Sequence, residues 1–267
     1  MTVLFASDLD RTLIYSRRSM GPDADPEMLT AVEEINGKLT AFMTTAGLAL
    51  HRQMSSKISF VPVTTRTAEQ YKRVTGLLDE VQEPEYAIVA NGAVILKNGV
   101  PMAEWSARIQ KQLLEDRATV KHVLKQLEVY TGKEFILEVK QAEEWFIYMI
   151  IDEQKFSPAE LEHLAKIFFR QGFTFSQQGR KLYIMPNCIN KATALNFVIK
   201  QLQAETVLAA GDSLLDLEMV KAADHGFIPA HGEAAQDAEV PASVRITAAS
   251  GIQAGEEILQ NVRRFLL

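Results

Sequence analysis

Two carboxylates separated by one residue, Asp8 and Asp10, lie shortly after the apolar residues 3–6 near the start of the chain. A second pair, Asp212 and Asp216, follows another apolar stretch near the other end. Carboxylate oxygens suit Mg²⁺, which prefers hard ligands and keeps several of its waters. A carboxylate can also attack phosphorus to form an acyl phosphate, and a neighbouring carboxyl group can move protons. These residue types therefore predict metal-assisted chemistry on a phosphoryl group.

Hydroxyl groups and one lysine complete the set. Thr64 and Thr65 follow a further apolar stretch, Ser213 lies between the two late aspartates, and Lys191 opens an expected helix. A phosphoryl group in transfer carries negative charge, which a metal, a lysine and hydroxyl groups can offset. Taken singly, an Asp-x-Asp pair is most often a solvated turn, and a lysine at a helix start is an ordinary surface residue. Their occurrence together favours catalysis, because ligands bind at the carboxyl ends of strands in open α/β sheets.

The order of strands and helices indicates how these residues come together. Both ends of the chain alternate between short apolar strands and helices, which is typical of a doubly wound parallel α/β sheet. In between, a helix followed by two strands occurs twice, which indicates an inserted α+β domain. We therefore expect residues 1–90 and 187–267 to form a Rossmann-like core. Residues 91–186 are expected to form a smaller domain with an antiparallel sheet.

Local signals predict several elements of the core and the insert. A cap at Asp25 followed by proline predicts a short helix over residues 26–35. The Asn-Gly dipeptide after it predicts a hairpin turn before a strand over residues 38–44. Single helices are expected over residues 67–78 and 107–129 from their apolar spacing.

Composition limits the partners of the chain. Its 267 residues include 28 Lys+Arg and 34 Asp+Glu, a formal net charge of −6, and this balance argues against nucleic acid. The longest apolar run, residues 145–151, is far shorter than the roughly 18 residues of a membrane span, and no signal-peptide pattern is visible. The single cysteine, Cys188, excludes an internal disulfide. We expect a cytoplasmic protein that binds a small molecule, with neither a nucleic acid nor a membrane as partner; no pattern specifies its oligomeric state.

The motifs resemble, in order, those of the haloacid dehalogenase superfamily. The segment from Asp8 to Thr12 resembles its DxDxT motif, and Thr64 its second-motif hydroxyl residue. Lys191 resembles its third-motif lysine, and the segment from Gly211 to Asp216 its GDxxxD motif. The insert resembles the larger cap of the Cof-type and sucrose-phosphatase-like branch. The resemblance covers essentially the whole chain.

This resemblance implies a phosphatase with a covalent intermediate. Asp8 would be the nucleophile that forms an aspartyl phosphate, and Asp10 the general acid and base. Asp10 bears on the reaction class, because dehalogenases of the superfamily lack a second aspartate whereas phosphatases and mutases have it. The resulting prediction is a Mg²⁺-dependent phosphatase for a small phosphorylated metabolite, such as a sugar phosphate. The alternatives are a hexose-phosphate phosphomutase and a low-activity binding or regulatory module with the same fold.

The resemblance also implies the binding groups. Lys191 and one of the two threonines, with Thr64 favoured over Thr65, would hold the phosphoryl oxygens. The implied ligands of Mg²⁺ are Asp8, the backbone carbonyl of Asp10, and Asp212, and the implied supporting residues are Asp216 and Ser213.

The chain departs from the superfamily pattern at several positions. Arg11 stands where a small residue is common, and it either contacts the substrate or points to solvent. Leu215 stands where asparagine is frequent. Asp8 and Thr64 are 64 − 8 = 56 residues apart, which is long for this branch. The extra residues include the strand expected over 38–44 and the helix after it, which could overhang the site.

Overall fold

A computed structural model describes residues 2–22, 24–78, 83–116, 120–128, 133–236 and 240–266. The chain divides into two units, Met1–Met102 with Lys191–Leu267, and Ala103–Asn190. The first crossing lies later than the expected boundary at residue 91, because the strands that follow residue 91 pair within the first unit. The predicted fold class, a doubly wound α/β core with an inserted α+β unit, is confirmed.

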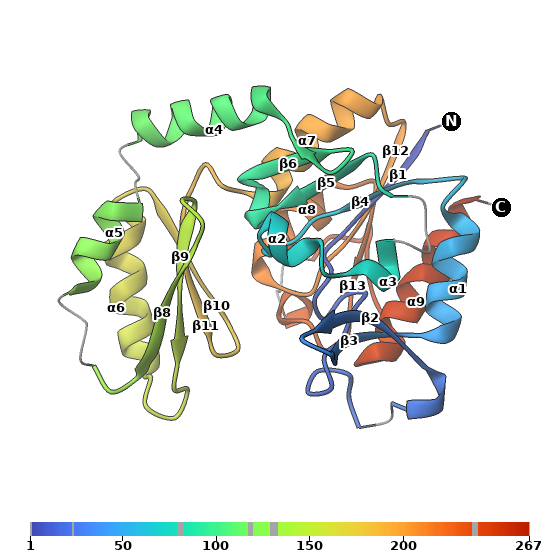
Figure 1. Ribbon diagram of the computed structural model, residues 1–267, viewed down its shortest axis with the longest axis horizontal. Helices are drawn as coiled ribbons and strands as arrows, with labels where there is room; N and C mark the ends of the chain where they lie inside the picture. The colour runs from blue at the N-terminus through green and yellow to red at the C-terminus, as the bar shows by residue number, and fades with distance from the viewer. Residues whose placement is uncertain are drawn as a thin grey trace. The chain divides into compact units, whose positions relative to one another are not determined.

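The first unit is built on a parallel sheet of five strands flanked by helices (Figure 1). β1 (Val3–Ser7), which lies between two other strands of this sheet, is buried along its whole length, as expected for a strand covered on both faces. In sheet order the strands are β14 (Val244–Ile246), β13 (His225–Ile228), β12 (Thr206–Ala210), β1 (Val3–Ser7) and β4 (Ser59–Pro62). The main helices are α1 (Thr45–Met54), α7 (Lys191–Leu202), α8 (Leu214–Ala222) and α9 (Ile252–Arg263). Of these, α1 packs against α9, and α7 packs against α8.

A three-stranded antiparallel sheet continues the core beyond β4. A parallel bridge between Val63 and Ile88 joins the two sheets just after β4 ends. Pro62 is accommodated because it is the last residue of β4, which is the edge strand of the five-stranded sheet. The strands of the second sheet are β5 (Tyr86–Val89), β6 (Val94–Lys97) and β7 (Val100–Pro101).

The helix predicted over residues 26–35 is wrong. Asp25 does cap a turn, since its side chain accepts from the backbone N–H of Glu27, but the helical turn η1 (Pro26–Met28) ends there. The chain continues as β2 (Leu29–Ile35), which pairs with β3 (Lys38–Thr44) across the predicted hairpin turn. The capping signal is local, whereas the partner strand that makes residues 29–35 extended comes only after the turn.

The helix predicted over residues 67–78 is interrupted, because these residues form α2 (Ala68–Tyr71) and α3 (Thr75–Leu78). The described residues of the helix predicted over 107–129 include the end of α4 (Ala103–Glu115) and the whole of α5 (Val120–Leu127). Residues 117–119 and 129 of that prediction lie outside the described residues. Among the described residues, the short 3-10 helices besides η1 are η2 (Ala90–Gly92), η4 (Glu233–Gln236) and η5 (Arg264–Leu266).

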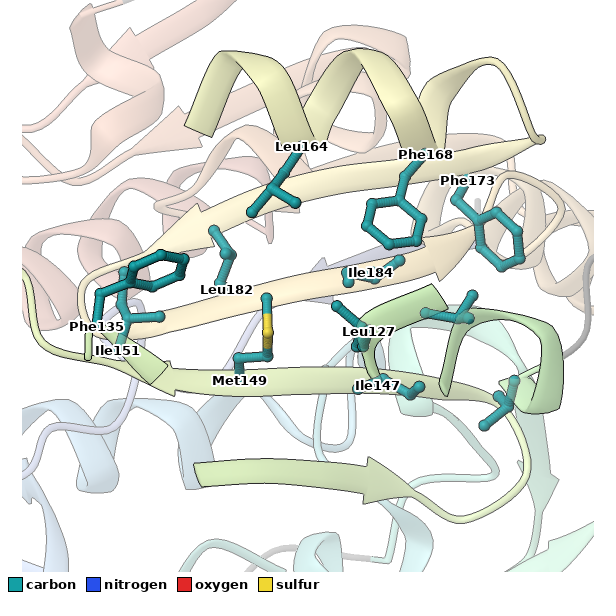
Figure 2. Close-up of a cluster of buried hydrophobic side chains, with 12 residues drawn as sticks. Leu127, Phe135, Ile147, Met149, Ile151, Leu164, Phe168, Phe173, Leu182 and Ile184 are labelled. Carbon is teal, nitrogen blue, oxygen red and sulfur yellow. The ribbon is translucent and has the colours of Figure 1, made fainter. Parts of the chain in front are cut away.

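The second unit repeats a helix followed by two strands, as predicted. Its antiparallel sheet has the order β10-β11-β9-β8, and a capping box at Ser157 begins the second helix. Figure 2 shows Leu164 and Phe168 of that helix pointing toward the side chains of Met149, Leu182 and Ile184 on the sheet. The elements, besides α4 and α5, are β8 (Ile136–Ala142), β9 (Phe146–Ile151), α6 (Pro158–Phe169), β10 (Phe173–Gln178) and β11 (Lys181–Pro186). Within the described parts of both units, no helix has the length and apolar character needed to cross a membrane.

Two adjacent phenylalanines of α6 give a direct test of this packing. Phe168 is fully buried against Phe173 and Phe175, whereas Phe169 is 71% exposed. Phe168→Ala should lower the free energy of unfolding by about 3–5 kcal/mol, because it leaves a cavity in the apolar cluster. The matched control Phe169→Ala should change it by less than about 0.5 kcal/mol. Urea unfolding followed by circular dichroism measures both, and similar losses for the two variants would contradict the described burial.

Candidate active site

The carboxyl ends of three neighbouring strands bring the predicted motifs together. β1 lies between β4 and β12, so Asp8 leaves the sheet next to the segments that begin with Thr64 and Asp212. Backbone bonds extend the pairing to these positions: Val63 donates to the carbonyl of Ser7 at 2.8 Å, and Asp8 donates to that of Ala210 at 2.9 Å. This edge is where open α/β sheets bind ligands.

Lys191 joins the two ends of the chain. It is the first residue of α7, its side chain is fully buried, and its Nζ lies 2.6 Å from Oδ1 of Asp8 and 2.5 Å from Oδ1 of Asp216. Burial alone would lower the pKa of Lys191, but the charges of Asp216 and Asp8 raise it above its ordinary value. The side chain is therefore an ammonium ion at neutral pH and donates to the carboxyl groups of both residues.

Asp216 uses both of its carboxylate oxygens within the protein. While Oδ1 binds Lys191, Oδ2 accepts from the backbone N–H of Ser213 at 2.9 Å and from its hydroxyl at 2.6 Å. Gly211 permits this arrangement, because a Cβ atom there would lie 2.2 Å from the Cβ of Asp216. The two predicted supporting residues thus orient Lys191 and the start of α8.

Asp8 and Asp212 are buried carboxylates with raised pKa values. Burial raises the pKa of Asp8 well above its ordinary value, although the charge of Lys191 opposes the shift. Burial and the charge of Asp216 raise the pKa of Asp212 to about 7, against the opposing charges of Arg11 and Lys191. Burial thus disfavours the charged forms of both groups, and a bound cation would favour those forms.

These buried carboxyl groups and the set of oxygen donors fit a divalent cation. Oxygen atoms of Asp8, Asp212 and Asp216 all lie within 4.8 Å of one another, and all three residues are buried. Because Asp216 already binds Lys191 and Ser213, the carboxylates of Asp8 and Asp212 are the side chains best suited to hold the ion. Oxygen donors of this kind match the preference of Mg²⁺.

The side chain of Asp10 points to a different partner. Its two oxygens accept hydrogen bonds from Nε of Arg66 at 2.7 Å and from Nη2 of Arg66 at 2.8 Å. The Asp10 side chain is 51% exposed. The guanidinium also binds Glu33, with Nη1 at 2.5 Å from Oε1. Sequence reasoning assigned no role to Arg66, although it directly follows the two candidate threonines. It missed Glu33 because residues 26–35 were expected to be helical.

The two candidate threonines lie on the turn after β4. Thr64 is fully buried, its backbone N–H donates to Ile88, and its hydroxyl oxygen accepts from the backbone N–H of Arg66 at 3.1 Å. Thr65 is half-buried beside it. Thr64 is thus the more restrained of the two hydroxyl groups, and its own O–H proton is not used in the bond to Arg66.

Arg11 pairs with Asp212, an arrangement that neither sequence alternative included. Its Nε lies 3.2 Å from Oδ2 of Asp212, and its side chain remains partly exposed. The backbone of Arg11 is left-handed, with φ at 65°, and its carbonyl accepts from Nε2 of His231 at 3.0 Å. The backbone N–H of Gly251 donates to Nδ1 of the same ring at 3.1 Å, so a neutral ring carries its proton on Nε2. These contacts hold the turn after Asp10 in place.

The fold and this constellation define a phosphatase of the haloacid dehalogenase superfamily. A family model described as "Sucrose-6F-phosphate phosphohydrolase" matches residues 1–265. The chain belongs to this family and is a phosphoric monoester hydrolase. A search by sequence found no match among curated proteins.

Solved structures from several organisms share the fold over nearly the whole chain. The sucrose-phosphatase of Synechocystis sp. PCC6803, solved with sucrose and phosphate, is 16% identical with a TM-score of 0.70, covering 99% of this chain and 97% of its own. A HAD/COF-like hydrolase from Plasmodium vivax is 14% identical with a TM-score of 0.63, covering 98% and 95%. A haloalkanoate dehalogenase-superfamily phosphatase from Bacteroides thetaiotaomicron is 14% identical with a TM-score of 0.55, covering 100% and 96%.

The raised pKa of Asp212 predicts how stability depends on pH without metal. The folded state holds this proton up to a pH of about 7, whereas the unfolded chain releases it near the ordinary pKa of 3.8. The unfolded state is therefore increasingly favoured as pH rises between these values. Asp212→Asn cannot ionise, and its stability relative to the wild type should therefore increase over this range and level off above it. Added Mg²⁺ should stabilise the wild type and not the variant.

Thermal unfolding in a chelating buffer, across a pH series and then with Mg²⁺, measures both effects. The exposed Asp116→Asn provides a matched control that should follow the wild type at every pH. A constant difference between Asp212→Asn and the wild type across the series would contradict the raised pKa.

Proposed function

We propose that this protein is a Mg²⁺-dependent phosphatase that hydrolyses a phosphorylated sugar through an aspartyl-phosphate intermediate. The observation that carries the proposal is the buried contact of Lys191 with Asp8 and Asp216 at the ends of the central strands. Membership in the sucrose-6F-phosphate phosphohydrolase family supports a sugar phosphate as the substrate class. The structural neighbour that holds sucrose and phosphate supports the same class.

In this proposal Asp8 and Asp10 divide the chemistry. A carboxylate oxygen of Asp8 attacks the phosphorus atom, and the ester bond to the sugar oxygen breaks. Asp10, which is more exposed, donates a proton to that leaving oxygen. Asp10 then takes a proton from water as the water attacks the aspartyl phosphate, and inorganic phosphate leaves while Asp8 is regenerated.

The other residues stabilise negative charge on the phosphoryl group. Lys191 is permanently charged and holds Asp8 in position, and the hydroxyl of Thr64 is suited to donate to a phosphoryl oxygen. Mg²⁺ bound by Asp8, the carbonyl of Asp10 and Asp212 would supply further positive charge at the reacting group. Thr65 is the alternative hydroxyl donor.

The second unit, Ala103–Asn190, is proposed as the cap that selects the sugar. On β9 and β11, Tyr148 and Tyr183 face each other in register with their ring centroids 5.7 Å apart, and Nζ of Lys181 lies 5.8 Å from the centroid of Tyr148. Alternation along β9 places them on the sheet face opposite the one that packs on α6. Aromatic rings with nearby polar groups suit a ligand with apolar faces and hydroxyl edges.

A panel of phosphate esters tests the function. Sucrose 6F-phosphate, other sugar phosphates and non-sugar metabolites are each incubated with and without Mg²⁺, and the products are identified by NMR. Release of inorganic phosphate, dependent on Mg²⁺ and fastest with a sugar phosphate, is the expected result. An isomeric phosphate ester would instead indicate a mutase, and no turnover of any ester would indicate a binding module.

Asp8→Asn provides the direct test of the nucleophile. The amide is nearly isosteric but a poor nucleophile, so turnover should fall far below a tenth of the wild-type rate, a barrier increase well above roughly 1.4 kcal/mol. Circular dichroism should show an intact fold, and Lys191 retains Asp216 as a partner. Retention of more than about a tenth of the rate would remove Asp8 from the nucleophilic role.

A further inference from the structure

The hairpin of β2 and β3 contributes a buried carboxylate to the candidate site. Glu33 comes from this hairpin, and its side chain is only 7% exposed. The pairing of β2 with β3 is irregular on both sides of Glu33, between Ala31 and Glu33 and between Glu33 and Glu34. Bulges of this kind redirect a side chain, and here Val32 and Glu33 are both buried although they are adjacent in a strand. The irregularity therefore turns the Glu33 side chain toward Arg66.

The guanidinium of Arg66 lies between Glu33 and Asp10 and is only 14% exposed. Nε and Nη2 donate to the two oxygens of Asp10, while Nη1 and Nη2 donate to the two oxygens of Glu33. Nη1 also approaches the backbone carbonyl of Gln70 at 3.5 Å. An arginine has five N–H donors, and these contacts engage all of them. Arg66 in this arrangement therefore binds protein carboxylates and offers no donor to a phosphoryl group.

The hairpin is itself fixed to other segments of the first unit. Tyr15, which follows the first motif, exchanges two backbone hydrogen bonds of 2.9 Å with Phe42 of β3. On the other strand, α3 approaches so closely that a Cβ atom on Gly76 would lie 2.7 Å from Cα of Val32. Figure 1 shows β2 and β3 beside α3. Glu33 thus projects from a supported strand and is further held by the hydroxyl of Thr40, at 2.8 Å from Oε2.

We infer that Glu33 is a positioning residue. It holds the guanidinium group of Arg66, which in turn orients the carboxyl group of Asp10 for proton transfer. The inference rests on the proposed function, because it takes Asp10 as the general acid. Without Glu33, Arg66 loses the partner that keeps its guanidinium buried, and the side chain of Asp10 loses a fixed orientation. The hairpin, which accounts for part of the unusual distance between the first two motifs, would then serve catalysis by supporting Asp10.

Leaving-group dependence distinguishes this role from a general structural one. Protonation matters most when the leaving oxygen is a poor leaving group, such as an alkoxide, and little when it is a nitrophenolate. Glu33→Gln should therefore lower kcat/KM for alkyl phosphates by about tenfold to a hundredfold, part of the usual general-acid contribution, and change that for nitrophenyl phosphate little. The inhibition constant of inorganic phosphate should stay close to the wild-type value, because phosphate binding does not involve Glu33.

Matched variants complete the experiment. Glu34→Gln changes the adjacent, exposed glutamate and should leave every rate unchanged. Asp10→Asn defines the full loss of leaving-group protonation, and adding Glu33→Gln to it should lower kcat/KM no further. Thr40→Val removes the hydroxyl that binds Glu33 and should give the same pattern as Glu33→Gln with a smaller effect; it decides the question if Glu33→Gln does not fold.

The outcomes separate this inference from the proposed function. No turnover by the wild type would overturn the proposed function. The wild type and Asp10→Asn can behave as expected while Glu33→Gln lowers kcat/KM equally for all esters, or for none. That result would overturn only the positioning role. Additive losses in the double variant would do the same.

Discussion

The ammonium group of Lys191 is the contact on which the site depends. It is buried between Asp8 and Asp216, and its partner Asp8 lies 183 positions away from it in the sequence. A buried charge without a partner is costly, and breaking such a pair typically costs about 3–5 kcal/mol. The ends of β1, α7 and α8 must therefore meet in one arrangement, although the whole second unit, Ala103–Asn190, lies between them along the chain.

The two aspartates of the first motif have contrasting surroundings. Asp8 is buried against Lys191, whereas Asp10 is half exposed and bound by the guanidinium group of Arg66. Different environments commonly assign different roles to neighbouring carboxyl groups. Restraint next to a permanent positive charge suits an attacking oxygen, and exposure suits a group that must exchange protons with a leaving group and with water. The proposed division of roles thus follows from position.

Positive groups around the site are engaged mainly by carboxylates of the protein. Lys191, Arg66 and Arg11 each bind one or two acidic side chains. Asp8 and Asp212 still have raised pKa values, because burial outweighs these contacts. A buried site whose donors are carboxylate oxygens suits a small divalent cation, which would offset the charge of these groups and attract a phosphoryl group. In the proposed function, metal binding would therefore favour substrate binding through electrostatics.

Sequence alone determined the features that depend on local patterns and on motif order. Apolar strands followed by Asp8, Thr64 and Asp212 predicted the parallel core and the edge at which these residues meet. Only the tertiary structure decided which side chains share a partner: Asp216 with Lys191, Arg11 with Asp212, and Arg66 with both Asp10 and Glu33. The expected helix over residues 26–35 failed for the same reason. Its capping signal is local, whereas the pairing with β3 and the bulge at Glu33 arise from contacts that a single segment does not encode.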